Sequence, residues 1–149
     1  MSITRRLFGA LAACALVSAA EARAGDFSLR AGAYTDVDSL FVGAEYRAPL
    51  QGRIYIAPNF ELAFPDEGTY FSFSADVHYV FPTKSELSPW LGGGLGIYTR
   101  GHDGGGSDTT AGLNLVAGLG LRTKLKPYAQ VKVVVKDDTA FVAGFGIRF

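Results

Sequence analysis

Apolar residues alternate with polar or small residues along most of the chain after residue 25. In the stretch 53–64, for example, Ile54 and Phe60 fall on one face of an extended chain, and Asn59 and Glu61 fall on the other. A period of two is typical of β-strands that have one apolar face, whereas helices repeat every 3.6 residues. No segment of this part of the sequence has a convincing helical period. The pattern therefore predicts an all-β protein.

The same alternation predicts eight strands, separated by short turns that are rich in Gly, Pro, Asp and Lys. Their expected bounds are about 26–35, 39–48, 53–64, 69–81, 89–99, 111–123, 127–136 and 141–149. Short connections favour antiparallel pairing of consecutive strands. Closure into an up-and-down barrel removes the two free edges of such a meander. Pro58 lies in the middle of a predicted strand, where we expect a bulge.

The size of the barrel decides which face points inward. Eight strands enclose a lumen only just wide enough for side chains, and the apolar face carries too many aromatic residues to fit there. The opposite face is rich in glycine and in charges that can pair, so we expect the apolar face outward and a polar, Gly-rich lumen. A soluble lipocalin-like barrel, which would bind an apolar ligand inside, is the alternative. The lumen network is predicted to contain Arg30, Glu45, Arg47, Glu61, Asp76, His78, Lys132 and Arg148.

Strand length and the placement of aromatics agree with a membrane barrel. A tilted membrane strand needs about 9–11 residues, and the predicted strands have that length or slightly more. Interfacial girdles of aromatic residues are typical of such barrels. The aromatics near predicted strand ends are Phe27, Tyr46, Phe64, Phe81, Phe141 and Phe149.

Two motifs resemble a known group of proteins. The segment "PWLGGGLGIY" (89–98) and the final strand "FVAGFGIRF" (141–149) are similar to strands of small OmpA/OmpX-type outer-membrane β-barrels of Gram-negative bacteria, the generic outer-membrane beta-barrel domain family. In the final strand Gly144, Ile147 and Phe149 match the family's assembly signal, whereas Val142 replaces its usual polar residue. The resemblance implies recognition by the barrel-assembly machinery, periplasmic N- and C-termini, and contact with outer-membrane lipid and lipopolysaccharide.

The first 24 residues have the pattern of a cleaved secretory signal peptide. A basic start, "MSITRR", precedes an apolar run and the small-residue site "ARA", so cleavage is expected before Gly25. The segment "TRRLF" also resembles a twin-arginine signal, and "LAAC" resembles a lipobox that would lipidate Cys14 instead. Cleavage would remove Cys14, the only cysteine, and with it any disulfide or thiolate metal site. The sequence has no basic stripe of the kind that binds nucleic acid.

Few residues in the sequence are candidates for catalysis or metal binding. Small barrels that modify lipid A, as deacylases or acyltransferases, use Ser and His with a polar partner; here His102, Asp103 and Ser107 are the candidates. They lie in a glycine-rich loop that supplies no rigid scaffold. Asp76 and His78 are a candidate proton-linked pair or metal half-site, against the simpler interpretation of lumen hydrogen bonding. We expect no cofactor and no metal.

Acidic residues gather in the turns that the resemblance places outside the cell. They either share divalent cations with lipopolysaccharide or are solvated turn residues. They are Asp36, Asp38, Asp66, Glu67, Asp103, Asp108, Asp137 and Asp138. The function predicted from these observations is a monomeric barrel with a structural or membrane-integrity role and no open pore.

Overall fold

The computed structural model describes residues 25–149, which form eight strands and no helix. The signal peptide and the Cys14 alternative lie outside the described residues. The strands are β1 (Asp26–Tyr34), β2 (Ser39–Gln51), β3 (Ile54–Ala63), β4 (Thr69–Val80), β5 (Leu87–Gly101), β6 (Ser107–Leu121), β7 (Pro127–Val135) and β8 (Thr139–Arg148).

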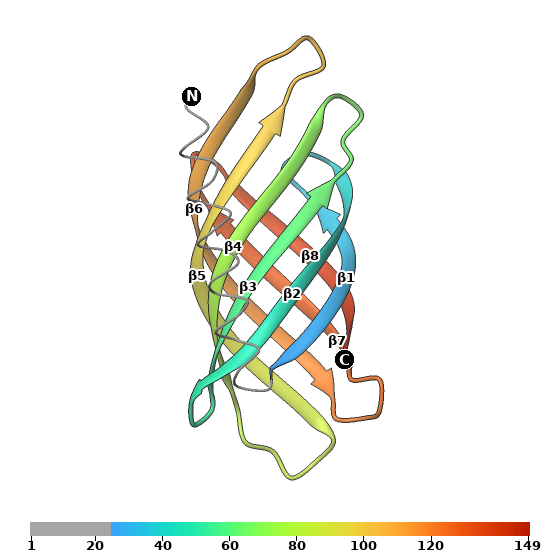
Figure 1. The fold of residues 1–149 in the computed structure, drawn as a ribbon, viewed down its shortest axis with the longest axis vertical. Coiled ribbons are helices and arrows are strands. Elements are labelled where there is room, and N and C mark those ends of the chain that lie inside the picture. Colours follow the sequence, from blue (N-terminus) through green and yellow to red (C-terminus); the bar gives the residue numbers. More distant parts are fainter. Residues whose placement is uncertain (1–24) are drawn as a thin grey trace.

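Each strand pairs antiparallel with its neighbours in sequence, and β8 pairs with β1 to close the barrel (Figure 1). The predicted up-and-down barrel is therefore confirmed. The largest difference from the predicted bounds is at β5 and β6, whose pairing continues as far as Gly101 and Ser107. The glycine-rich segment between them, expected as one long loop, is thus reduced to a short turn at the tip of an extended hairpin.

Pro58 does not form the predicted bulge. On one side of it Glu45 lies opposite Asn59, and on the other Ala48 lies opposite Ile56, in the same register. The ladder between β2 and β3 is interrupted between these pairs, but no extra residue is inserted. Proline lacks an N–H donor, so the strand omits local pairing instead of shifting its register.

The apolar face points outward, as predicted. Large hydrophobic side chains cover the outside of every strand; examples are Leu95, which is 65% exposed, and Phe145, which is 74% exposed. Of the expected aromatic girdle, Phe27, Phe64, Phe81, Phe141 and Phe149 are exposed and Tyr46 is half-buried. The polar residues of the same strands are buried in the lumen. The lipocalin-like arrangement, with apolar residues inside and polar residues outside, is the reverse of what is observed. Within residues 25–149, no helix is long and apolar enough to cross a membrane.

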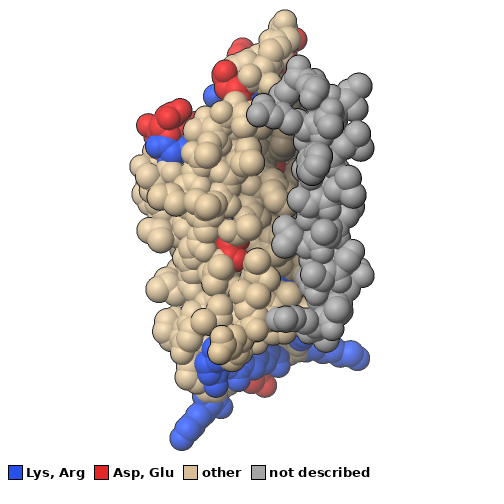
Figure 2. Space-filling view, turned by 60° about the vertical axis from the view of Figure 1, so that its left-hand side comes forward, with Lys and Arg blue, Asp and Glu red and all other residues tan. Residues whose placement is uncertain are grey.

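The two ends of the barrel differ in charge. We call the end with turns 35–38, 64–68, 102–106 and 136–138 the acidic end, because all but one of the predicted acidic turn residues lie in those turns and Asp108 follows close by on β6. The opposite end, with turns 52–53, 81–86 and 122–126, is the basic end and carries Arg53, Lys84, Arg122, Lys124 and Lys126. Figure 2 shows Lys and Arg gathered at the basic end, and a wide band with very little visible charge separates the two ends.

Candidate functional site

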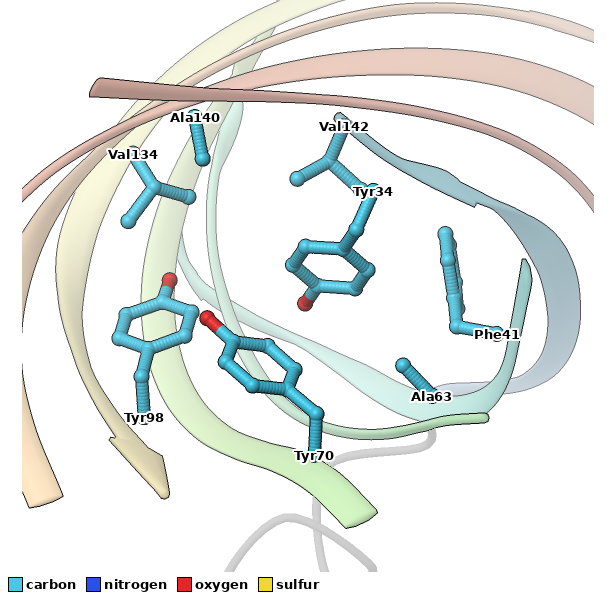
Figure 3. Close-up of a cluster of buried hydrophobic side chains, with 8 residues drawn as sticks. All are labelled: Tyr34, Phe41, Ala63, Tyr70, Tyr98, Val134, Ala140 and Val142. Atoms are coloured by element: carbon cyan, nitrogen blue, oxygen red, sulfur yellow. The ribbon is translucent and has the colours of Figure 1, made fainter. Parts of the chain in front are cut away.

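The lumen contains three layers of side chains, of which the layer nearest the acidic end is apolar. We call this layer the aromatic plug; Figure 3 shows its side chains converging inside the barrel. Tyr34 packs edge-on against both Phe41 and Tyr70, with ring centroids 5.2 Å apart in each pair. The plug consists of Tyr34, Phe41, Ala63, Tyr70, Tyr98, Val134, Ala140 and Val142.

The middle layer is a network of buried charges centred on Arg30 and Glu61. The Arg30 guanidinium donates to Glu45 Oε2 at 2.8 Å and to Glu61 Oε1 at 2.5 Å. Lys132 Nζ and Tyr34 Oη also donate to Glu61, each at 2.8 Å. The ionised side chains are almost completely buried. Buried charges persist only when paired and hydrogen-bonded, and these four residues meet that condition together with Tyr34.

Sheet register explains how Arg30 reaches Glu61 from two strands away. Arg30 on β1 lies opposite Gly43 on β2, and Gly43 lies opposite Glu61 on β3. A Cβ at Gly43 would lie 2.9 Å from Glu61 Cγ and 2.6 Å from the Phe60 carbonyl oxygen. Because Gly43 has no side chain, the space between Arg30 and Glu61 stays open and their charged groups come into contact.

Asp76 extends the network without a cation. Its carboxylate accepts hydrogen bonds from Asn59 Nδ2 at 2.9 Å and from Asn114 Nδ2 at 3.0 Å. Tyr98 Oη in turn donates to Asn114 at 2.5 Å. Asn59 also accepts from Arg30, so it joins Asp76 to the charged centre. Here two amide side chains satisfy one carboxylate, an arrangement that a search for opposite charges does not predict.

The third layer is built around Trp90, on the side of the basic end. Arg47 and Arg148 lie over its ring, with their Cζ atoms 5.3 and 5.0 Å from the ring centroid. Gly118 makes room, because a Cβ there would overlap the indole. Cation–π contacts of this kind stabilise an arginine against an aromatic face.

His78 and Arg47 lie in the lumen but outside the hydrogen-bonded network in which they were predicted. His78 stacks on Trp90 with ring centroids 6.1 Å apart, and neither of its ring nitrogens has a hydrogen-bond partner in the part of the chain that the structure describes. It is therefore not bonded to Asp76, whose oxygens are occupied by the two amides. The other predicted members of the lumen network are hydrogen-bonded within it. Arg148, for example, donates to Glu45 Oε1 at 3.3 Å.

Below the Trp90 layer, the lumen opens at the basic end into a cavity of about 570 Å³. We call it the basic vestibule. Arg47 and Arg148 reach it from inside, and residues of the strand ends and turns form its rim. Its charged lining residues are Asp26, Arg47, Arg53, Arg122, Lys126 and Arg148.

The candidate hydrolase residues are not assembled into a catalytic site. His102 Nε2 bonds Asp108 Oδ2 at 2.9 Å, whereas Asp103 accepts from the backbone N–H of Gly68. Ser107 is exposed at the start of β6, and no described hydrogen bond joins it to His102. A nucleophile needs a base within hydrogen-bond reach. In the described part of the chain, no three His, Cys, Asp or Glu side chains gather as possible metal ligands.

The residues of the predicted assembly signal all lie on β8 or directly after it. Gly144 lies opposite Gly32 on β1, and Ile147 is exposed on the outer face. Phe149 is 63% exposed, and its backbone N–H donates to the Phe27 carbonyl. Their recognition by assembly machinery stays a prediction.

Two functional features were missed by reasoning from the sequence. The charges of the inward face predict a polar lumen and do not reveal the aromatic plug, although Val134, Ala140 and Val142 occupy inward positions in the same alternation. The basic vestibule was missed because its lining comes from five separate segments, which no local motif connects.

Comparison with known proteins finds solved structures of similar fold. No protein-family model and no curated protein matches the chain. Among solved structures, the N-terminal β-barrel domain of Pseudomonas aeruginosa OprF is similar with a TM-score of 0.68 and 18% identity, over 85% of this chain and 100% of that one. Neisserial surface protein A (NspA) is similar with a TM-score of 0.61 and 17% identity, over 83% and 92%. The outer membrane enzyme PagL is similar with a TM-score of 0.54 and 14% identity, over 83% and 98%.

These likenesses are structural, because the identities are low, and they include one enzyme. Strand number, antiparallel order and closure agree with the observed barrel. The chain therefore has the fold of the small eight-stranded outer-membrane β-barrels.

Proposed function

We propose that the protein is an outer-membrane β-barrel with a structural or membrane-integrity role, without an open pore and without enzymatic activity. The observation that carries the proposal is the inverted distribution of polarity. Charged residues that are normally found on a protein surface are buried in the lumen, and the outside of every strand is apolar. A water-soluble protein would expose that apolar belt to solvent at great cost, whereas a bilayer solvates it.

The filled lumen supports the absence of a pore. The aromatic plug, the charge network and the Trp90 layer follow one another across the interior, and Trp90, Tyr34, Lys132 and Glu61 are among its largest fully buried side chains. An ion that crossed the barrel would have to break the Arg30–Glu61 pair. We expect no ion conductance in planar bilayers.

The charge difference between the ends supports an orientation. We infer that the acidic end faces outside and the basic end faces the periplasm, which puts both ends of residues 25–149 in the periplasm. Lipopolysaccharide would then contact the acidic turns, and β8 would present Gly144, Ile147 and Phe149 to the assembly machinery. Some acidic residues are engaged within the protein, because Lys136 Nζ pairs with Asp36 at 3.1 Å and Asp138 at 2.8 Å.

A matched pair of arginine substitutions tests the membrane role. Leu95 is 65% exposed in the middle of β5, and Leu125 is 62% exposed in a turn at the basic end. At the bilayer midplane an outward arginine costs about 2–4 kcal/mol, and near the interface about 0–1 kcal/mol. Leu95→Arg should therefore lower the urea concentration at which the vesicle-inserted barrel unfolds, and Leu125→Arg should not.

Cell fractionation completes the test. The protein should be recovered with outer membranes and should change its electrophoretic mobility on boiling in SDS, as closed membrane barrels do. Recovery in the osmotic-shock fluid without detergent, together with equal stability of the two arginine variants, would refute a lipid-facing belt.

A further inference from the structure

The positive charge of the basic vestibule is not balanced by the residues that line it. Among the described residues, five cationic side chains line the cavity but only one carboxylate does; the cations are Arg47, Arg53, Arg122, Lys126 and Arg148. That carboxylate, Asp26, already pairs with Lys126 at 3.1 Å. Arginine and lysine side chains that converge around a cavity raise the local concentration of anions.

The imbalance continues inside the lumen. The buried cations are Arg30, Arg47, Lys132 and Arg148, and the buried carboxylates are Glu45, Glu61 and Asp76. Arg30, Lys132 and Arg148 each form an ion pair with Glu45 or Glu61. Within residues 25–149, no carboxylate forms an ion pair with Arg47. Arg47 is therefore the buried cation that has no ion pair, and it lines the vestibule.

Unpartnered donors gather at the same place. Arg47 is only 8% exposed, yet its Nε and Nη1 have no hydrogen-bond partner among the described residues, and neither does Nε of Arg148, which is 4% exposed. The indole Nε1 of Trp90, whose ring both guanidinium groups contact, also lacks one within residues 25–149. Buried donors without partners are rare in folded proteins, and a bound ion or water is one recognised way in which they are satisfied.

We propose that the basic vestibule binds a phosphate group. Arg47 and Arg148, at the inner floor of the vestibule, hold the phosphate, and the positive charges of Arg53 and Arg122, at its outer rim, help to neutralise it. A guanidinium offers paired N–H donors that match two oxygens of a phosphate. Two guanidinium groups over one indole ring suit a tetrahedral oxyanion, because it presents separate oxygens to each of them. A volume of about 570 Å³ also lies within the range of small-molecule pockets, about 300–1,000 Å³.

The phosphate can belong to a soluble phosphomonoester or to the headgroup of an anionic phospholipid at the membrane edge of the vestibule. The chemistry at Arg47 and Arg148 is the same for both. The two sources differ in whether the phosphate arrives from water or from the bilayer, and the experiment separates them on that basis.

The protein, extracted from membranes, is titrated with inorganic phosphate and with glycerol 1-phosphate at an ionic strength kept constant with chloride. Trp90 is the only tryptophan, so its emission reports directly on the floor of the vestibule. In parallel, the protein is placed in phosphatidylcholine nanodiscs with and without phosphatidylglycerol. A saturable emission change with the soluble phosphates assigns a free phosphate ligand, and a change only with phosphatidylglycerol assigns a lipid headgroup; either supports the site.

Arg47→Met should weaken binding by about tenfold or more, as expected for the loss of charge-assisted hydrogen bonds. It removes an unpaired buried charge, so the barrel should keep its heat-dependent mobility shift. Arg53→Met at the exposed rim should weaken binding less, and it provides a second variant that leaves the floor intact. Lys84→Met, in an exposed turn at the same end but outside the vestibule, is the matched control and should bind normally.

Three results would overturn the proposal. These are no emission change beyond that of chloride with either phosphate source, unaltered affinity in Arg47→Met, or an equal loss of affinity in Lys84→Met. None of them bears on whether the barrel resides in a membrane, which the pair of arginine substitutions on the outer belt tests separately.

Discussion

Replacing Glu61 by glutamine tests whether the charge network stabilises the barrel. Glu61 accepts hydrogen bonds from Arg30 at 2.5 Å, from Lys132 at 2.8 Å and from Tyr34 at 2.8 Å. Glutamine keeps the shape of the side chain but removes its charge and turns one acceptor into a donor. Arg30 would keep its ion pair with Glu45, whereas Lys132 would lose its only ion pair within the described residues.

The expected loss of stability follows from Lys132, whose ammonium group would be left without an ion pair. Breaking a buried ion pair by removing one partner costs about 3–5 kcal/mol, because the remaining charge stays buried without compensation. Lys132 is 1% exposed and cannot reach water without displacing its neighbours. Glu61→Gln should therefore lower the free energy of unfolding by about 3–5 kcal/mol.

Urea unfolding of the vesicle-inserted protein, followed by the emission of Trp90, measures this free energy. Glu67→Gln is the matched control, since Glu67 is exposed in a turn at the acidic end and should change stability by less than about 0.5 kcal/mol. Adding Lys132→Met to Glu61→Gln removes the orphaned charge and should restore most of the loss. A Glu61→Gln variant as stable as the control, or a double variant no better than the single one, would refute the reasoning.

Three further predictions concern other parts of the barrel. Gly118→Ala places a methyl group against the buried ring of Trp90 and should destabilise the protein by about 1–3 kcal/mol, measured by the same unfolding assay, with a shift in indole emission. The hydrogen bond from Lys136 lowers the pKa of Asp138, so this carboxylate contributes stability above its ordinary pKa of about 3.9, and the contribution is lost as the pH falls through the lower folded value. Asp138→Asn should thus be less stable than the unmodified protein at neutral pH by less than about 1 kcal/mol, and the difference should disappear in acid. Ser107→Ala should leave the mass spectrum of lipid A from producing cells unchanged, and a change would revive the enzymatic alternative.

The sequence is sufficient for the fold because alternation acts on every strand. A shift of one residue would place Phe71 or Phe73 in the lumen and Asp76 in lipid, so register and facing are strongly determined. The fate of Pro58 was not predictable, because whether a strand bulges or omits a pairing depends on the neighbouring strand. Similarly, alternation places His78 inside but cannot distinguish a hydrogen-bonded histidine from one stacked on Trp90. Such differences arise from contacts between residues far apart in sequence, for which no periodic signal exists.

The position of Glu61 has a consequence for the order of folding events. Its partners come from β1, 31 and 27 residues away, and from β7, 71 residues away. Strands β1 to β6 can pair in order while Glu61 still lacks its partner Lys132, which lies on β7. The network gains Lys132 only when the seventh strand arrives and the Arg148–Glu45 pair only with the eighth, and an open sheet must keep its charged face in water until then. Closure of the ring and neutralisation of its interior are thus coupled into a single late and cooperative step.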